Sequence, residues 1–275
     1  MDLSGRKVLV TGAGTGIGRG TAIHLALQGA DVAVHYSRSN TGALSAVEEI
    51  RAMGRNAHAL YADLGDVTQA LRLPLEAAEV LNGLDGVVNN AGITMNMAFL
   101  ETTQEQFDAV FNVNIRGMFF VSQGAAKIMV PNGGGTIVNI SSVHAYTAMV
   151  EHSVYAATKA AIVGFTRTLS LELIQLGVRM NCIASGWVLV ENQRKVLGLD
   201  ESFDEEAAGQ ILPSGFIGQA DDIGKLAAFL SSSDSRYIIG QTIVCDGGQT
   251  TVMPATPDFR SPIGVQYGQG YVPGV

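Results

Sequence analysis

Short apolar runs alternate with longer stretches of mixed apolar and polar residues along this chain. Several of the runs are rich in Val and Ile and nearly continuous in apolar character, as is typical of strands with both faces covered. Runs of this length, bounded by glycine and polar residues, indicate strands. The predicted strands are residues 7–10, 31–36, 56–61, 86–89, 136–140, 179–184 and 242–245.

Helical patterns fill the stretches between these strands. A helix over residues 19–29 follows the first strand, and the longest helices are predicted over residues 103–129 and 153–176. Strands that alternate with helices favour a parallel sheet. We therefore predict an α/β fold with a seven-stranded parallel sheet, and no internal repeat or linker divides the chain.

The turn after the first strand is rich in glycine. Glycine permits close backbone approach and positive φ angles. A strand, a glycine turn and a helix N-terminus together can receive a pyrophosphate on backbone N–H groups. We interpret the turn as a dinucleotide site, and a tight turn without a ligand is the alternative. The turn reads Thr11-Gly12-Ala13-Gly14-Thr15-Gly16-Ile17-Gly18.

A second motif lies in the predicted helix over residues 153–176. Tyr155 and Lys159 are four residues apart, which places both side chains on one helix face, and Ser142 lies thirteen residues before the tyrosine. A nearby ammonium favours the phenolate form of a tyrosine. Such a pair is suited to proton exchange with a carbonyl or an alcohol. Alone, the pair would also fit a tyrosine packed on a lysine stem, but the glycine turn favours a redox site.

These motifs, together with Asn114 and the run Asn89-Asn90-Ala91-Gly92, resemble the main branch of the short-chain dehydrogenase/reductase family. The resemblance extends from about residue 5 to Gly248. It implies a single doubly wound Rossmann domain over residues 1–250, with helices on both faces of the sheet. It also implies a nicotinamide dinucleotide and hydride exchange with a carbonyl or secondary alcohol. A nucleotide-sensing protein without turnover is the alternative from another class.

The resemblance implies a role for each catalytic residue. Tyr155 would transfer the proton, and Lys159 would bind the nicotinamide ribose and favour the phenolate. Ser142 would orient the substrate oxygen, because the spacing to the tyrosine selects it over Ser141. Asn114 would hold a water that connects Lys159 to solvent. Asparagine is unfavourable inside a helix, and a locally unfavourable residue often marks function.

Most of the cofactor contacts follow from the same resemblance. The glycine turn would receive the pyrophosphate, and segments after the third, fourth and sixth strands would meet the adenine, the ribose and the nicotinamide. These residues are Gly12, Gly14, Thr15, Gly16, Ile17, Gly18, Asp63, Leu64, Asn90, Ala91, Gly92, Gly186 and Val188, and Tyr155 and Lys159 are also predicted to contact the cofactor. The family usually has Pro-Gly and a later threonine where this chain has Ser185, Gly186 and Val190. We therefore expect a softer loop and a weaker hold on the nicotinamide.

The end of the second strand favours NADP(H). An NAD site usually has an acid there, whereas an NADP site has an arginine for the 2′-phosphate. No acid is present, and Arg38 could bind a phosphate through two hydrogen bonds, with Ser37 and Ser39 as further donors. Thr15 is not basic, which counts against this choice. NAD(H) is the alternative, in a dehydrogenase of a sugar, polyol or sterol-like alcohol.

The substrate is weakly specified. His144, Met149 and Trp187 are the predicted substrate contacts, and residues 187–215 form a charged, irregular loop similar to a lid. Residues 251–275 are rich in Pro, Gly and aromatic residues. We expect either a frayed terminus or a tail that closes an active site.

Composition limits the classes of partner. The chain has 275 residues and a formal net charge of −8, which argues against nucleic acid. The five histidines and two cysteines show no metal-ligand spacing, so no metal is expected. The absence of a long apolar run and of a secretion signal predicts no membrane partner and a cytoplasmic location. The family resemblance adds a small-molecule carbonyl or alcohol substrate and a homotetramer that pairs its two long helices between subunits.

Overall fold

A seven-stranded, all-parallel sheet forms the centre of the computed structural model, which describes residues 1–200, 202–252 and 258–260. The strand order is β3-β2-β1-β4-β5-β6-β7. The strands are β1 (Lys7–Val10), β2 (Asp31–Tyr36), β3 (Ala57–Tyr61), β4 (Gly86–Asn89), β5 (Gly135–Ser142), β6 (Val178–Ser185) and β7 (Thr242–Cys245). The order reverses between β1 and β4, which is where ligands of such sheets bind.

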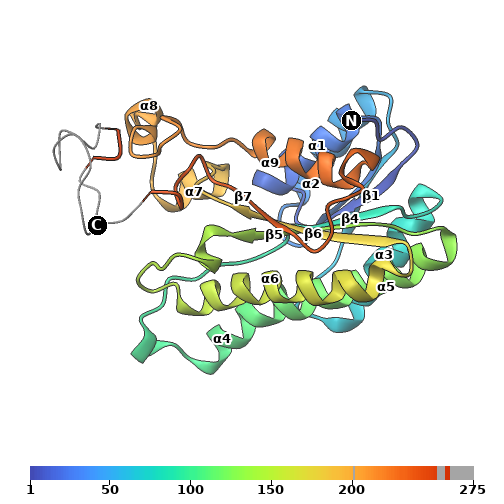
Figure 1. The fold of residues 1–275 in the computed structure, drawn as a ribbon, viewed down its shortest axis with the longest axis horizontal. Helices are drawn as coiled ribbons and strands as arrows, with labels where there is room; N and C mark the ends of the chain where they lie inside the picture. The colour runs from blue at the N-terminus through green and yellow to red at the C-terminus, as the bar shows by residue number, and fades with distance from the viewer. Residues whose placement is uncertain (201, 253–257, 261–275) are drawn as a thin grey trace, which may run out of the picture.

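Helices cover both faces of this sheet (Figure 1). One layer holds α1 (Gly16–Leu27), α2 (Asn40–Ala52) and α9 (Ala220–Ser231). The other layer holds α3 (Val67–Leu81), α4 (Gln104–Phe111), α5 (Met118–Met129) and α6 (Ser153–Ile174). Two short helices, α7 (Glu191–Val196) and α8 (Glu205–Gly209), lie beyond the carboxyl end of the strands. The predicted doubly wound α/β fold is confirmed.

The hydrophobic core is divided by the pleat of the sheet. Successive side chains of a strand point to opposite faces. Val8 and Val10 on β1 therefore pack in the same buried cluster as Leu25 of α1. Leu9, between them, packs in the cluster that contains Leu73 of α3 and Val121 of α5. The almost continuously apolar strand β1 thus contributes side chains to two hydrophobic clusters, one on each face of the sheet.

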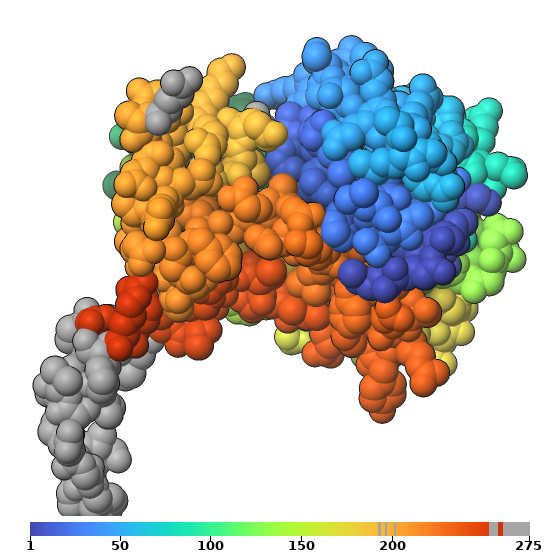
Figure 2. All heavy atoms as spheres, turned by 90° about the horizontal axis from the view of Figure 1, so that it is seen from above, coloured from blue at the N-terminus to red at the C-terminus, as the bar shows by residue number. Residues whose placement is uncertain are grey.

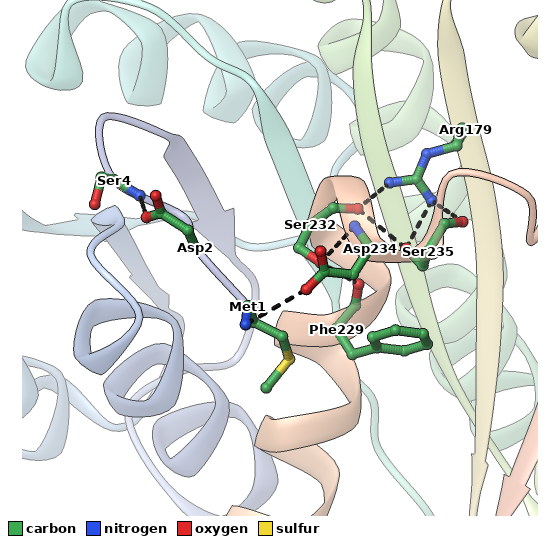
Figure 3. A network of polar contacts seen from close by, with 8 residues as sticks. All are labelled: Met1, Asp2, Ser4, Arg179, Phe229, Ser232, Asp234 and Ser235. Atoms are coloured by element: carbon green, nitrogen blue, oxygen red, sulfur yellow. Dashed lines mark hydrogen bonds and ion pairs between the residues drawn. The ribbon is translucent and has the colours of Figure 1, made fainter.

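A polar network fixes the end of α9 against the sheet (Figure 3). Arg179 on β6 donates to the carbonyl of Ser232 at 2.7 Å, and to the carbonyl and hydroxyl oxygens of Ser235 at 3.1 and 3.0 Å. The amino group of Met1 lies 3.4 Å from a carboxylate oxygen of Asp234 in the same turn. The guanidinium therefore supplies a donor to the carbonyl of Ser232, the C-cap residue of α9.

Two predicted elements differ from the structure in detail. The helix predicted over residues 103–129 is interrupted by a π-helical turn, Asn112–Gly117, between α4 and α5. The predicted irregular loop over residues 187–215 contains α7 and α8, and the Asp204 carboxylate accepts the N–H of Ala207 as the N-cap of α8. None of the described helices is long and apolar enough to cross a membrane.

Candidate active site

The glycine turn after β1 is bound to the segment after β4, at the point where the strand order reverses. The Thr11 hydroxyl accepts the N–H groups of Asn90 and Ala91, each at 3.0 Å. In return, the Asn90 amide donates to the carbonyls of Thr11 and Gly12 at 3.0 and 3.1 Å. Two of the predicted cofactor segments therefore form one rigid unit.

Glycine is required in this turn because the backbone is crowded. Gly12 has a φ of +65°, and a Cβ there would lie 2.9 Å from the Cα of Ala91. A Cβ at Gly18 would lie 2.2 Å from the carbonyl oxygen of Gly12. A Cβ at Gly14 would lie 2.6 Å from the carbonyl oxygen of Ser39. The turn is therefore folded tightly against β2 and the β4 segment.

The start of α1 can bind an anionic oxygen. The N–H of Gly16 donates to a carboxylate oxygen of Glu191 at 3.0 Å. A pyrophosphate oxygen has the same charge and accepts the same kind of hydrogen bond. Thr15 is the N-cap residue of α1, and Ile17 packs against the core. The turn thus fits the predicted dinucleotide, with the Glu191 carboxylate standing in for its phosphates.

Glu191 comes from the segment that was predicted to form the substrate loop. Figure 2 shows this segment, in orange, as a lobe beside the blue N-terminal residues. A Cβ at Gly16 would lie 3.2 Å from the side chain of Val190, so the start of α7 packs directly on the glycine turn. Sequence reasoning did not find Glu191, because only the fold brings it to a turn 175 residues away.

The predicted adenine and 2′-phosphate contacts lie at the ends of β2 and β3. Ser37 and Arg38 are exposed, and Ser39 is half-buried next to Gly14. Asp63 is exposed, and its carboxylate accepts the N–H of Gly65 at 2.9 Å, whereas Leu64 is buried. Arg38 directly precedes the residue that contacts Gly14, and its role at a 2′-phosphate stays a prediction.

Tyr155 and Lys159 share one face of α6, as their spacing predicts. The Lys159 ammonium lies 5.5 Å from the centre of the Tyr155 ring and donates to the carbonyl of Ile140 at 3.0 Å. Ser142 ends β5, and its hydroxyl accepts the N–H of His144 at 3.3 Å. The Ser141 hydroxyl instead donates to the backbone carbonyl of Lys159 at 2.8 Å. Ser141 thus supports α6, in agreement with the choice of Ser142 as the catalytic serine.

Asn114 lies in the π-helical turn and ties three segments together. Its amide accepts the N–H of Ile93 at 2.8 Å and donates to the Ile93 carbonyl at 2.9 Å and to the Thr158 hydroxyl at 3.1 Å. A Cβ at Gly92 would lie 3.3 Å from the Asn114 amide oxygen and 3.7 Å from the Lys159 ammonium. π-helical turns are frequent at functional sites. Asn114, Gly92 and Lys159 therefore meet behind the tyrosine.

Replacing Asn114 with alanine is expected to lower the free energy of unfolding by about 1–3 kcal/mol, because the half-buried N–H and C=O of Ile93 lose their partner. Urea denaturation measures this difference. Asn112→Ala is the matched control, since Asn112 is only half-buried in the same turn. Equal destabilisation by both substitutions would show that the Ile93 contacts contribute nothing.

Three aromatic rings gather at the mouth of the site. His144 and His152 stack with ring centres 5.2 Å apart, and both meet the Tyr155 ring edge-on at 5.7 and 6.2 Å. Burial, and then the nearby His152, lower the pKa of His144, which favours its neutral form. His152 was not among the predicted site residues, although its three-residue step before Tyr155 on one helix was an available signal.

A cavity of about 830 Å³ opens beside these rings. His144 and Met149, two of the predicted substrate contacts, line it together with His152, Tyr146 and Val150. Trp187, like Tyr155 and Ser142, does not line this cavity, and its place as a substrate contact stays a prediction. The backbone N–H of Trp187 donates to the Gln249 amide oxygen at 3.3 Å, which holds it with the segment after β7. In the described part of the chain, no group of three or more His, Cys, Asp or Glu residues is arranged to hold a metal ion.

The segment after β6 is held more firmly than its sequence suggests. Ser185 is a strand residue paired with Ser142 and Cys245, and its hydroxyl donates to the Ser141 carbonyl at 3.3 Å. A Cβ at Gly186 would lie 2.5 Å from the Cα of Asp246. Ser185 itself therefore belongs to the sheet, and the softness of the loop that follows stays a prediction. Further along the same segment, Val188 forms an isolated parallel β-bridge with Gly218.

Comparison with known proteins agrees with this geometry. A family model described as enoyl-(acyl carrier protein) reductase matches residues 12–250. The hydroxynaphthalene reductase-like protein Arp2 of Metarhizium majus is 36% identical over 262 residues, which cover 91% of this chain and 97% of that protein.

Solved structures are equally similar. Acetoin dehydrogenase from Enterobacter cloacae has a TM-score of 0.84 and 33% identity, over 94% of this chain and 100% of that one. A short-chain dehydrogenase from Burkholderia cenocepacia, in complex with NADP, has a TM-score of 0.83 and 34% identity, over 91% and 100%. The chain belongs to the short-chain dehydrogenase/reductase family, the NAD(P)-dependent oxidoreductases that act on alcohol and ketone groups.

Proposed function

We propose that this protein transfers a hydride between NADP(H) and a carbonyl or secondary alcohol substrate, with Tyr155 as the general acid and base. The observation that supports this most strongly is the placement of Tyr155, Lys159 and Ser142 at the carboxyl end of the sheet. There the Lys159 ammonium lies next to Gly92, which follows the strand next to the glycine turn. The bound dinucleotide would supply or accept the hydride.

Each side chain has a separate task in this proposal. Tyr155 gives its proton to the carbonyl oxygen in reduction and takes it back in oxidation. Lys159, held by the Ile140 carbonyl, places a positive charge beside the phenol and reaches the ribose. Ser142 accepts only the N–H of His144 among the described contacts, so its own proton is available for the substrate oxygen. Asn114 holds the segment that carries Gly92 in place.

The substrate is proposed to occupy the cavity lined by His144 and Met149. The relatives' names give substrates of very different size, hydroxynaphthalene and acetoin. A panel of ketones and secondary alcohols that spans this range, followed by NADPH and NADH absorbance, tests the function. Turnover of a ketone with NADPH is the expected result, and NADPH binding without turnover of any compound would favour a nucleotide-sensing protein.

Arg38→Ala is expected to raise the Kd for NADPH about 10–100-fold, because one or two charge-assisted hydrogen bonds to the 2′-phosphate are lost. The Kd for NADH, which lacks this phosphate, should not change. The NADP complex of the Burkholderia relative supports the same preference. Fluorescence titration with both cofactors measures the effect, with Arg72→Ala on the exposed face of α3 as the control. A loss shared by NADPH and NADH would favour the NAD(H)-linked alternative.

We propose a homotetramer in which α5 and α6 pair between subunits. The small residues Ala160 and Gly164 and the 68% exposed Leu171 share the outer face of α6. A second cavity of about 390 Å³ lies between α5 and α6. Light scattering is expected to give four times the chain mass of 28.8 kDa. A mass of one chain would contradict the assembly.

The C-terminal tail proposed to close an active site lies largely outside the described residues. In its described part, Arg260 donates hydrogen bonds to the carbonyls of Gln210 and Leu212. The bond to Leu212 is 2.9 Å long. The tail thus contacts the segment proposed to cover the substrate. Truncation after Thr251 should change substrate preference or assembly, and unchanged kinetics and mass would refute this role.

The cytoplasmic location stays a prediction.

A further inference from the structure

His35 is a buried polar residue in the middle of the apolar strand β2. Its side chain is 1% exposed. The backbone N–H of Gly12 donates to its Nδ1 atom at 3.0 Å, and its Nε2 atom lies 3.0 Å from the carbonyl oxygen of Ala62. One ring therefore connects the glycine turn after β1 with the segment after β3.

The two hydrogen-bond partners determine the protonation state and the tautomer of the His35 imidazole. An amide N–H can only donate and a carbonyl oxygen can only accept. Nδ1 must therefore carry a lone pair toward Gly12, and Nε2 must carry the proton that reaches Ala62. His35 is thus neutral and held in the Nε2–H tautomer. A second proton, on Nδ1, would face the Gly12 N–H and break that contact.

Both partners belong to segments that would hold the cofactor. Gly12 opens the glycine turn, and its carbonyl is bound on the other side by Asn90, so side chains from two strands hold this left-handed residue. Ala62 directly precedes Asp63 and Leu64, the proposed adenine contacts. The distance between the pyrophosphate and adenine segments is consequently set through the imidazole.

We propose that His35 is a positioning residue for the dinucleotide. Its neutral ring fixes the N–H of Gly12 and the carbonyl of Ala62, so that the glycine turn and the segment after β3 are ordered before the cofactor arrives. This inference rests on the proposed function, because it presupposes NADP(H) binding. A preordered turn binds more tightly, since less conformational entropy is lost when the ligand binds.

Two amide substitutions separate the two hydrogen bonds. In His35→Asn, the amide oxygen can take the place of Nδ1 and accept from Gly12, while the bond to Ala62 is lost. In His35→Gln, the longer side chain can bring its NH₂ group to the place of Nε2 and donate to Ala62, while the bond to Gly12 is lost. Each variant keeps one buried hydrogen bond and loses one, so the pair is matched for polarity and for the number of contacts.

The Kd for NADPH, measured by fluorescence titration without any substrate, is the main readout. We expect it to rise about tenfold in His35→Gln, as one lost hydrogen bond predicts, and to change far less in His35→Asn. Wild-type affinity for NADPH in both folded variants would overturn the proposal, because the ring would then order neither segment for the cofactor. A wild-type protein that binds neither NADPH nor NADH would overturn the proposed function itself.

A measurement on the wild-type protein keeps the proposal testable if both variants fail to fold. The nitrogen NMR signals of the His35 ring should show a proton on Nε2 and none on Nδ1. Addition of NADPH should shift the Gly12 amide signal while the ring keeps this tautomer. A proton on Nδ1, or a ring that changes tautomer freely, would contradict the inference.

Discussion

Tyr155→Phe is expected to lower kcat about 10²–10⁴-fold, the contribution typical of a positioned general acid and base. The substitution removes only the hydroxyl oxygen. The ring that meets His144 and His152 edge-on, and that lies 5.5 Å from the Lys159 ammonium, is kept. The Kd for NADPH should therefore stay unchanged, so the loss appears in the chemical step.

Steady-state and single-turnover kinetics with the best ketone of the panel measure this loss. Tyr237→Phe is the matched control, because Tyr237 is 97% exposed and does not line the cavity beside the three rings. Its turnover should equal that of the wild type. Full activity in Tyr155→Phe would show that the proton passes through another group, and the stacked His144 would be the first one to test.

Lowering the pH from 6.5 to 4 is expected to remove about 3 kcal/mol of stability through His35 alone. Burial lowers the pKa of this imidazole from 6.5 to about 4, and the hydrogen bond to the Ala62 carbonyl opposes the shift. The unfolded chain takes up the proton near pH 6.5, and the folded protein takes it up only near pH 4. Between these values the unfolded state binds more protons, so the free energy of unfolding falls as the pH falls.

Urea denaturation at several pH values between 4 and 7.5 checks this prediction. His35→Asn supplies the reference, because asparagine does not titrate and every other ionisable group is unchanged. The difference in stability between wild type and variant should be constant above pH 6.5 and should shrink toward pH 4. Parallel curves over the whole range would mean that the buried ring does not control acid stability.

Local patterns were sufficient to predict the strands and the placement of Tyr155 and Lys159 on one helix face. The apolar runs and glycine turns predicted all seven strands, because burial on both faces requires continuous apolar residues. The strand boundaries were predicted less accurately than the strands themselves. β5 and β6 pair residue by residue as far as Ser142 and Ser185, beyond the apolar runs, because neighbouring strands satisfy the backbone of polar residues too.

Contacts between distant segments could not be predicted in this way. The π-helical turn around Asn114 depends on the backbone of Ile93. The hydrogen bond between the Trp187 N–H and the Gln249 side chain joins residues that are 62 positions apart. The sequence shows His35 as a polar residue inside an apolar strand. Its proposed role in positioning the cofactor follows only from its hydrogen bonds to the backbone of Gly12 and Ala62.

The division between sequence and tertiary structure has a physical origin. Spacing along one helix or strand follows from backbone geometry, so the Tyr155–Lys159 pair, the glycine turn and the parallel sheet could be predicted from residue order alone. Hydrogen bonds across the fold depend on which segments meet, and that is decided by packing of the whole core. The contact of Glu191 with the glycine turn, the tautomer of His35 and the cavity beside the three rings were therefore decided only by the tertiary structure.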